Sequence, residues 1–223
     1  MSKRIFSPGK SSVRLMVAAV TLALTPVLTH AQGFSGLFNT GVNGSGTPLA
    51  AGATDTHYQV VENGLAQAFV VNNAAPYVFD ANSRYIWQQA DGQPTNVTRT
   101  LRTTFTINAG FNPLTAVLNG KWSTDNTGLD IFLNGVSTGN TSAGFGAFTS
   151  FSLTSGFVAG LNTLDFRVQD VGVISALAVT DLVGRAELST PPTNVVPEPS
   201  AVALMTAGLA ALGVVARRRK RQA

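Results

Sequence analysis

Short runs of alternating hydrophobic and polar residues fill the middle of the chain. In the run 101–107, Leu101, Thr103, Phe105 and Ile107 fall on one face and polar residues on the other. The same period of two recurs in three further runs, over residues 116–122, 129–133 and 164–168. Such alternation indicates half-buried β-strands, because successive side chains of a strand point to opposite faces.

Turn sequences separate these runs, and Asn134-Gly135 is a strong hairpin signal. A long apolar run over 177–188 predicts a central strand, and weaker strands are expected over residues 58–62, 68–71 and 145–153. The pattern predicts an all-β domain over 32–188, folded as an antiparallel β-sandwich of jelly-roll type. The expected flanking elements are an N-terminal signal helix and a C-terminal transmembrane helix.

The basic residues of the chain cluster at its two ends, and the middle of the chain is acidic. The 223 residues carry a formal net charge of +4, but nine of the 15 basic residues lie in the first 14 and last seven positions. Residues 32–199 hold six basic and 11 acidic residues, a net charge of −5. This acidic balance gives no support to nucleic-acid binding. Because cysteine is absent, disulfides, thiol nucleophiles and cysteine-ligated zinc are excluded.

The first 31 residues have the three parts of a secretory signal. A basic segment precedes the apolar run 15–28, and small residues at Thr29 and Ala31 suit a signal peptidase. We predict export by the secretion translocon and cleavage after Ala31, which leaves Gln32 as the new N-terminus. The alternative is an uncleaved anchor, but 14 apolar residues interrupted by Pro26 are fewer than the about 20 that span a bilayer.

The C-terminal end has three consecutive features after a linker over residues 189–196. They are the tripeptide Pro197-Glu198-Pro199, an apolar helix-forming run over 201–216, and a basic end. Positive residues remain cytoplasmic, so a helix in the membrane would place the tripeptide and the domain on the far side. The residues expected to direct sorting and processing are Pro197, Glu198, Pro199, Arg217, Arg218 and Arg219.

This order of features over 197–223 resembles the PEP-CTERM sorting signal. The resemblance implies a Gram-negative bacterium that makes exopolysaccharide, and it implies recognition and cleavage by the membrane enzyme exosortase. The protein would be anchored transiently in the inner membrane and then reach the cell surface or extracellular matrix. A plain C-terminal membrane anchor is the alternative.

The segments 122–126, 130–135 and 156–166 are similar to parts of galactose-binding-like jelly rolls. The resemblance supports the fold, and many domains of that fold bind glycans, which makes exopolysaccharide a candidate partner. No ligand follows from the fold alone.

Enzyme interpretations are weak. Gly135 to Gly139 match the G-x-S-x-G pattern of serine hydrolases, but the pattern follows a hairpin turn and His57 precedes it in the chain. We therefore predict a non-catalytic module that binds glycan. A secreted polysaccharide hydrolase and a purely structural matrix component are the alternatives.

Sugar binding needs aromatic faces for stacking and polar side chains for hydroxyl groups. The candidate ligand-binding residues are Tyr85, Trp87, Arg102 and Asn126, with Trp87 expected at an exposed loop edge. Phe132 and Trp122 are further aromatic candidates, and Trp122 shares a face with Leu118, which favours the core.

No cofactor is required by any motif, but one loop has oxygen ligands of the kind that calcium takes. Asp125, Asn126 and Asp130 lie within six residues. An Asx turn at the top of a hairpin is the simpler interpretation, and a structural calcium site is the alternative.

Overall fold

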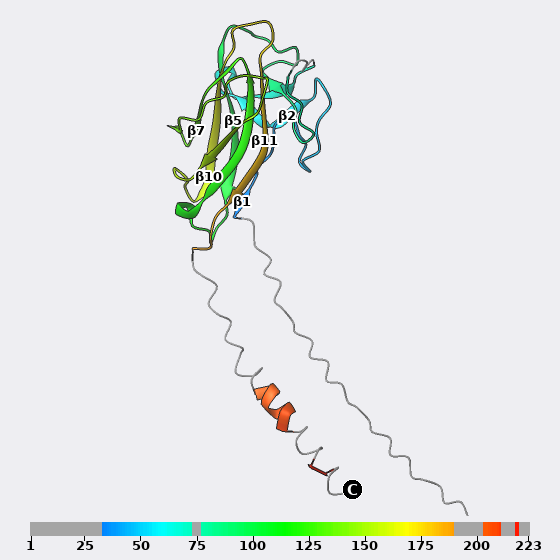
Figure 1. Cartoon of the computed structure of the whole chain (residues 1–223), viewed down its shortest axis with the longest axis vertical. Helices are drawn as coiled ribbons and strands as arrows, with labels where there is room; N and C mark the ends of the chain where they lie inside the picture. The colour runs from blue at the N-terminus through cyan, green and yellow to red at the C-terminus, as the bar shows by residue number, and fades with distance from the viewer. Residues whose placement is uncertain (1–32, 73–76, 190–202, 211–216, 219–223) are drawn as a thin grey trace, which may run out of the picture. The chain divides into compact units, whose positions relative to one another are not determined.

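The computed structural model describes residues 33–72, 77–189, 203–210 and 217–218 of the chain. Residues 33–189 contain eleven strands and two short 3₁₀ segments (Figure 1). The strands are β1 (Phe34–Ser35), β2 (Thr54–Val60), β3 (Ala66–Val70), β4 (Ile86–Trp87), β5 (Thr98–Ile107), β6 (Val117–Asp125), β7 (Thr127–Leu133), β8 (Val136–Ser137), β9 (Thr149–Leu153), β10 (Gly160–Gln169) and β11 (Ala176–Arg185). The 3₁₀ segments are η1 (Val61–Asn63) and η2 (Pro113–Thr115).

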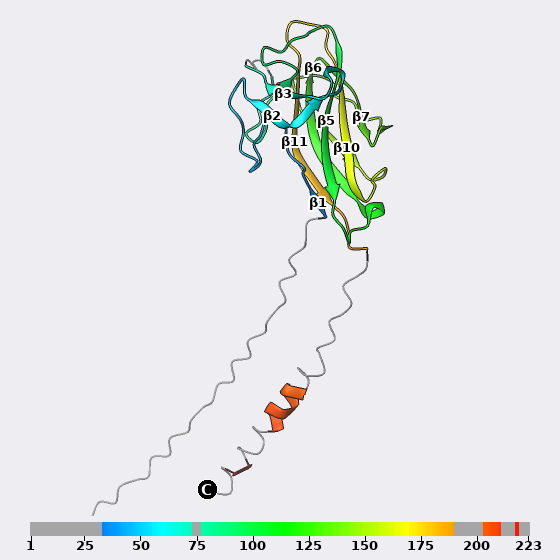
Figure 2. The same cartoon turned by 180° about the vertical axis from the view of Figure 1, so that it is seen from behind.

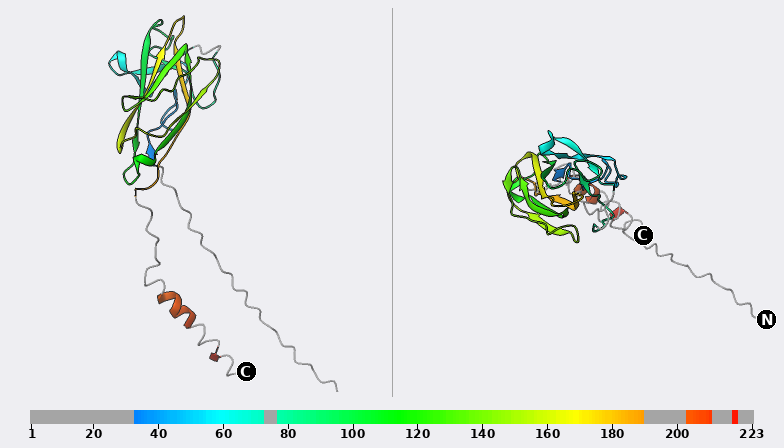
Figure 3. Two further views of the ribbon diagram at one scale, coloured as in Figure 1. Left: turned by 60° about the vertical axis from the view of Figure 1, so that its left-hand side comes forward. Right: turned by 90° about the horizontal axis from the view of Figure 1, so that it is seen from above.

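Every strand pair is antiparallel, and the strands follow the path β8-β7-β10-β5-β2-β3-β4-β11-β6-β9. Strand β1 lies off this path and pairs with β5. The path folds over, so that β5, β7 and β10 lie in one layer and β6, β9 and β11 in the facing layer (Figure 3). The predicted all-β antiparallel fold is confirmed at this level. The jelly-roll topology stays a prediction.

The alternation in the sequence corresponds to the burial in the sheet. Leu101, Thr103, Phe105 and Ile107 of β5 point into the core, whereas the residues between them face outward. Asn134-Gly135 joins β7 to β8 as a hairpin turn, with φ of 52° and 79° at its two residues. Positive φ at both central positions is the signature of a type I′ turn, and the hairpin predicted at these two residues is confirmed.

The core between the layers is rich in aromatic rings. Trp122 of β6 and Phe151 of β9 both pack on Phe166 of β10, at ring-centroid distances of 5.7 and 6.0 Å. A side chain at Gly128 would have to occupy the place of the Trp122 ring, because a Cβ there would lie 2.3 Å from it. The glycine therefore lets the large ring fit against β7, and Trp122 is a core residue as expected.

The two ends of the domain lie side by side. Asn108 N–H donates to the Gly33 carbonyl and Asn112 N–H donates to the Glu187 carbonyl, at 2.9 and 2.8 Å. Figure 2 shows β1 beside the end of β11. The linker to the C-terminal segment therefore leaves from the end of the strands where β10 begins. The opposite end of the strands, which we call the far end, lies nine residues further along β10, about 30 Å away.

The predicted flanking helices are described only in part. Residues 203–210 and 217–218 are helical. Among the residues with a described structure, no helix is long and apolar enough to cross a membrane, so the predicted transmembrane helix over 201–216 is not confirmed. The signal segment 1–31 and the cleavage residues Ala31 and Gln32 lie outside the described residues.

Candidate functional site

A row of four side chains crosses the outer face of one layer. Cross-strand pairing places Gln59 of β2 beside Arg102 of β5, Arg102 beside Asp165 of β10, and Asp165 beside Phe132 of β7. We call these four residues the Arg102 row. The neighbours of these four residues in the sequence, among them Leu101, are buried. Since successive side chains of a strand point to opposite faces, the four residues lie at outward positions.

Arg102 and Asp165 form the centre of this row. The guanidinium Nε and Nη2 donate to the two carboxylate oxygens of Asp165, each at 2.7 Å. This bidentate geometry fixes the plane of the guanidinium. The hydrogen bonds to Asp165 raise the pKa of Arg102 above its usual value, so it remains charged. Its side chain keeps 31 % of its surface exposed, whereas that of Asp165 keeps 8 %. The pair therefore presents guanidinium, and little carboxylate, to solvent.

A groove of about 310 Å³ lies beside Arg102. Polar side chains dominate its lining, and Phe38 supplies an aromatic ring. The lining residues are Gly36, Phe38, Thr56, His57, Gln59, Arg102, Thr103 and Thr104. Its volume is at the lower end of that of small-molecule sites. Hydroxyl, amide, imidazole and guanidinium groups thus line the groove, and none of its described lining residues carries a carboxylate.

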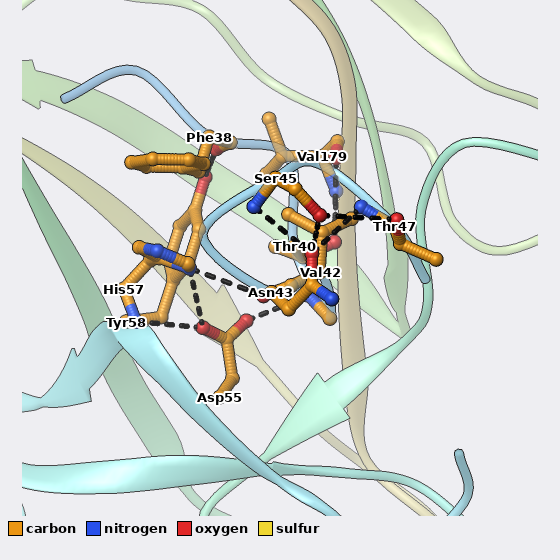
Figure 4. A network of polar contacts seen from close by, with 11 residues as sticks. Phe38, Thr40, Val42, Asn43, Ser45, Thr47, Asp55, His57, Tyr58 and Val179 are labelled. Carbon is orange, nitrogen blue, oxygen red and sulfur yellow. Dashed lines mark hydrogen bonds and ion pairs between the residues drawn. The ribbon is translucent and has the colours of Figure 1, made fainter. Parts of the chain in front are cut away.

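His57 forms the rim of the groove and is held in place from two sides (Figure 4). Its ring stacks on Phe38 with 3.8 Å between ring centroids. Its Nδ1 lies 3.1 Å from the Val42 carbonyl and 3.6 Å from Asp55 Oδ1. A carbonyl oxygen can only accept, so Nδ1 is the donor in the contact with Val42.

Asp55 is the buried anchor under this rim. It accepts hydrogen bonds from the backbone N–H groups of Gly41 and His57, at 2.6 and 2.8 Å (Figure 4). Burial raises the pKa of Asp55, and the two backbone hydrogen bonds partly oppose that rise. The segment that carries Gly41 is pinned in turn to β11, because Thr40 and Val179 bond to each other through N–H donors of both residues. The rim is therefore attached to both layers.

The structure separates the four predicted ligand-binding residues. Trp87 is fully buried and its Nε1 donates to the Pro94 carbonyl. Tyr85 is buried as well, its hydroxyl donates to Ser123 Oγ at 2.8 Å, and burial raises its pKa to about 12. The expected exposed loop edge at Trp87 is thus corrected, because Trp87 lies in the buried strand β4 and Tyr85, just before it, is buried as well.

The other two predicted residues are far apart. Arg102 lies in the groove, whereas Asn126 lies at the far end of the strands, where its N–H donates to the Gln169 carbonyl. Asp165, the partner of Arg102, and Gln169 are four residues apart on β10, about 14 Å. Phe132, which the sequence suggested as an aromatic candidate, does join Arg102 in one row.

Sequence reasoning missed the contributions of Phe38, Gln59 and Asp165 to this face. The outward positions of Gln59 and Asp165 were visible in the alternation of their strands. Their proximity was not visible, because it depends on strand order and register between segments up to about a hundred residues apart.

The domain is thus an antiparallel β-sandwich with a polar groove beside Arg102 on its outer face. Residues 195–220 match the model of the PEP-CTERM protein-sorting motif. This match confirms the predicted sorting motif and indicates an exported protein targeted to exosortase. Of the predicted sorting residues, the structure describes Arg217 and Arg218, both helical. No curated protein and no solved structure matches the chain.

Proposed function

We propose that the protein is displayed at the cell surface or in the extracellular matrix, where its β-sandwich binds glycan without cleaving it. In this proposal signal peptidase removes residues 1–31, the apolar segment 201–216 anchors the precursor in the inner membrane, and exosortase cuts near Pro197-Glu198-Pro199. The sorting motif supports the route. The exposed side chains of Leu204, Met205 and Leu209 support an apolar segment that needs lipid or a partner.

The groove beside Arg102 is the observation that carries glycan binding. A sugar ring offers many hydroxyl groups and apolar C–H faces, so its site needs fixed donors and acceptors beside an apolar surface. Arg102 is fixed by Asp165, and its Nη1 bonds to none of the residues that the structure describes. The Gln59 amide lies beside it, and Phe38 supplies the apolar surface.

The geometry favours binding over hydrolysis. Glycoside hydrolysis uses two carboxyl groups across a cleft, and no lining residue within the described part of the chain supplies one to this groove. Asp165 has both oxygens engaged by Arg102. The serine of the G-x-S-x-G pattern, Ser137, bonds to Asp130 on the neighbouring strand. Four strand spacings separate its strand β8 from β2, which carries His57, a distance of about 19 Å.

A pull-down with the mature exported protein on insoluble polysaccharides tests this function. We expect retention without released reducing sugar. The variant Gln59→Ala removes one amide from the groove, and we expect about a threefold to tenfold weaker affinity, as for one lost hydrogen bond. Gln169→Ala, an exposed change on β10 outside the groove, is the matched control and should bind as wild type.

Three results would contradict the proposal, each in a different way. Release of reducing sugar would make the protein a polysaccharide hydrolase. Absence of retention on every glycan tested would make it a structural matrix component. Equal losses in Gln59→Ala and Gln169→Ala would place the binding surface elsewhere on the domain.

A further inference from the structure

Two buried carboxylates lie at the far end of the sandwich, away from the groove and the linker. Asp125 is the last residue of β6, and Asp170 directly follows β10; they keep 8 % and 2 % of their surface exposed. Asn126, which follows β6, links the end of β6 to the end of β10. Its N–H donates to the Gln169 carbonyl at 3.1 Å, and its Oδ1 accepts from Val171 N–H at 2.6 Å.

The two carboxylates have oxygen lone pairs that accept no hydrogen bond from the described residues. Asp170 Oδ2 accepts from the backbone N–H groups of Asn96 and Gly172, at 2.7 and 3.3 Å. Asp170 Oδ1 is buried and has no hydrogen-bond partner within the described part of the chain. Asp125 Oδ2 accepts from the Tyr77 hydroxyl at 2.7 Å. Such an unpaired buried oxygen is uncommon in proteins, and a bound ion or water molecule would satisfy it.

Neither carboxylate has a basic partner. The ion pairs among the residues that the structure describes join Asp165 to Arg102 and Asp181 to Lys121, and the other basic side chain beside a carboxylate is His57, next to Asp55. Burial, and secondarily the charge of Asp170, raise the pKa of Asp125. Burial, with the hydrogen bond to Asp125, also raises the pKa of Tyr77. A buried negative charge is costly unless a cation or hydrogen bonds compensate it.

Gly172 shows that there is space beside these oxygens. A Cβ at this glycine would lie 3.8 Å from Asp170 Oδ1 and 3.7 Å from Asn126 Oδ1, both ordinary contact distances. The two oxygens therefore border the same small volume. The glycine leaves that volume without a side chain.

We propose that Asp125, Asn126 and Asp170 bind a calcium ion that fastens the 170–175 loop to the end of β6. Calcium takes six to eight oxygen ligands, including amide and backbone carbonyl groups and water. Within the described residues no group of three or more His, Asp or Glu could hold a metal, so neutral oxygens must complete the shell. A site with two carboxylates should bind with the modest affinity of extracellular calcium modules, Kd about 10⁻⁴–10⁻³ M.

This site differs from the one predicted by sequence. Asp130, the third residue of that prediction, hydrogen-bonds to Ser137 and to Ile131 N–H and belongs to the β7–β8 hairpin. Asp170 takes its place beside Asn126, although 44 residues separate them in sequence. Asp130→Asn and Asp170→Asn are therefore a matched pair of variants that distinguishes the two sites.

Calcium titration of the mature protein after treatment with a chelator tests the proposal. We expect isothermal calorimetry to give a Kd in the range above and 10 mM CaCl₂ to raise the Tm by about 3–10 °C. Magnesium at the same concentration should raise it less, because magnesium prefers a compact octahedral shell. Asp170→Asn should lose the calcium effect, and Asp130→Asn should keep it.

A second variant keeps the test decisive if Asp170→Asn does not fold. Gly172→Ala adds one methyl group to the volume between Asp170 and Asn126, and it should weaken calcium binding at least about threefold. No calcium effect in the wild-type protein would overturn the proposal. So would loss of the effect in Asp130→Asn together with its persistence in Gly172→Ala.

Discussion

Replacing Pro197, Glu198 and Pro199 by alanine is expected to stop release of the protein from the membrane. Proline disfavours helix at the residue before it and cannot continue a helix, so we expect these prolines to keep an apolar helix from extending into the junction. Three alanines would instead favour helix and remove the acidic side chain of the motif. Nearly all of the protein should then stay with the membrane fraction, with its C-terminal basic residues still attached.

Mass spectrometry of C-terminal peptides in the membrane and released fractions measures this effect. The variant Pro191→Ala/Pro192→Ala is the matched control, because it makes the same change in the linker, ahead of the matched residues 195–220. It should be cut and released like wild type. Intact tail peptides in released wild-type protein would contradict the sorting mechanism.

The strands of the domain could be predicted from sequence because strand alternation is a local property. Leu164, Phe166 and Val168 of β10 show it without knowledge of any partner strand, and all three are buried. The Asn134-Gly135 turn could be predicted for the same reason, since the required backbone conformation limits which residues occupy it. Local rules therefore gave the strands and one hairpin of this fold.

The candidate sites depend on contacts that no local pattern contains. Asp165 reaches Arg102 only because β10 lies beside β5, 63 residues apart at this pair. Asp170 replaces Asp130 beside Asn126 because β10 ends where β6 ends. Sequence proximity favoured Asp130, whose strand instead carries it into the next hairpin. The sequence showed which residues carry the required chemistry, but it did not show which strands pair or in which register, and these decide which residues meet at a site.

Trp87 shows how the same limitation misplaces an aromatic residue. Its neighbours Gln88 and Gln89 are polar and turn residues follow, so the sequence favoured a loop edge. In the structure Ile86 pairs with both Val70 and Leu177, which inserts β4 between β3 and β11. Both residues of β4 are fully buried, and the Trp87 indole is part of the core.

Trp87→Ala is accordingly expected to destabilise the domain strongly. The side chain is fully buried and its Nε1 bonds to the Pro94 carbonyl at 3.0 Å. Removing a buried Trp costs about 3–5 kcal/mol of unfolding free energy, which corresponds to a fall in Tm of about 6–20 °C. Phe79→Ala is the control, because this ring is 79 % exposed and contacts the Arg84 guanidinium, so its loss should change the unfolding free energy by less than about 1 kcal/mol.

The variant Trp87→Phe separates this structural role from a role in ligand binding. It keeps an aromatic ring in the core, so the protein should remain folded at the temperature of the pull-down, with reduced stability. Retention on polysaccharide, measured per folded molecule, should equal that of wild type because the Trp87 ring is covered by its neighbours. A loss of retention as large as that of Gln59→Ala, in a protein with an unchanged circular dichroism spectrum, would return Trp87 to the ligand surface and contradict the groove as the site.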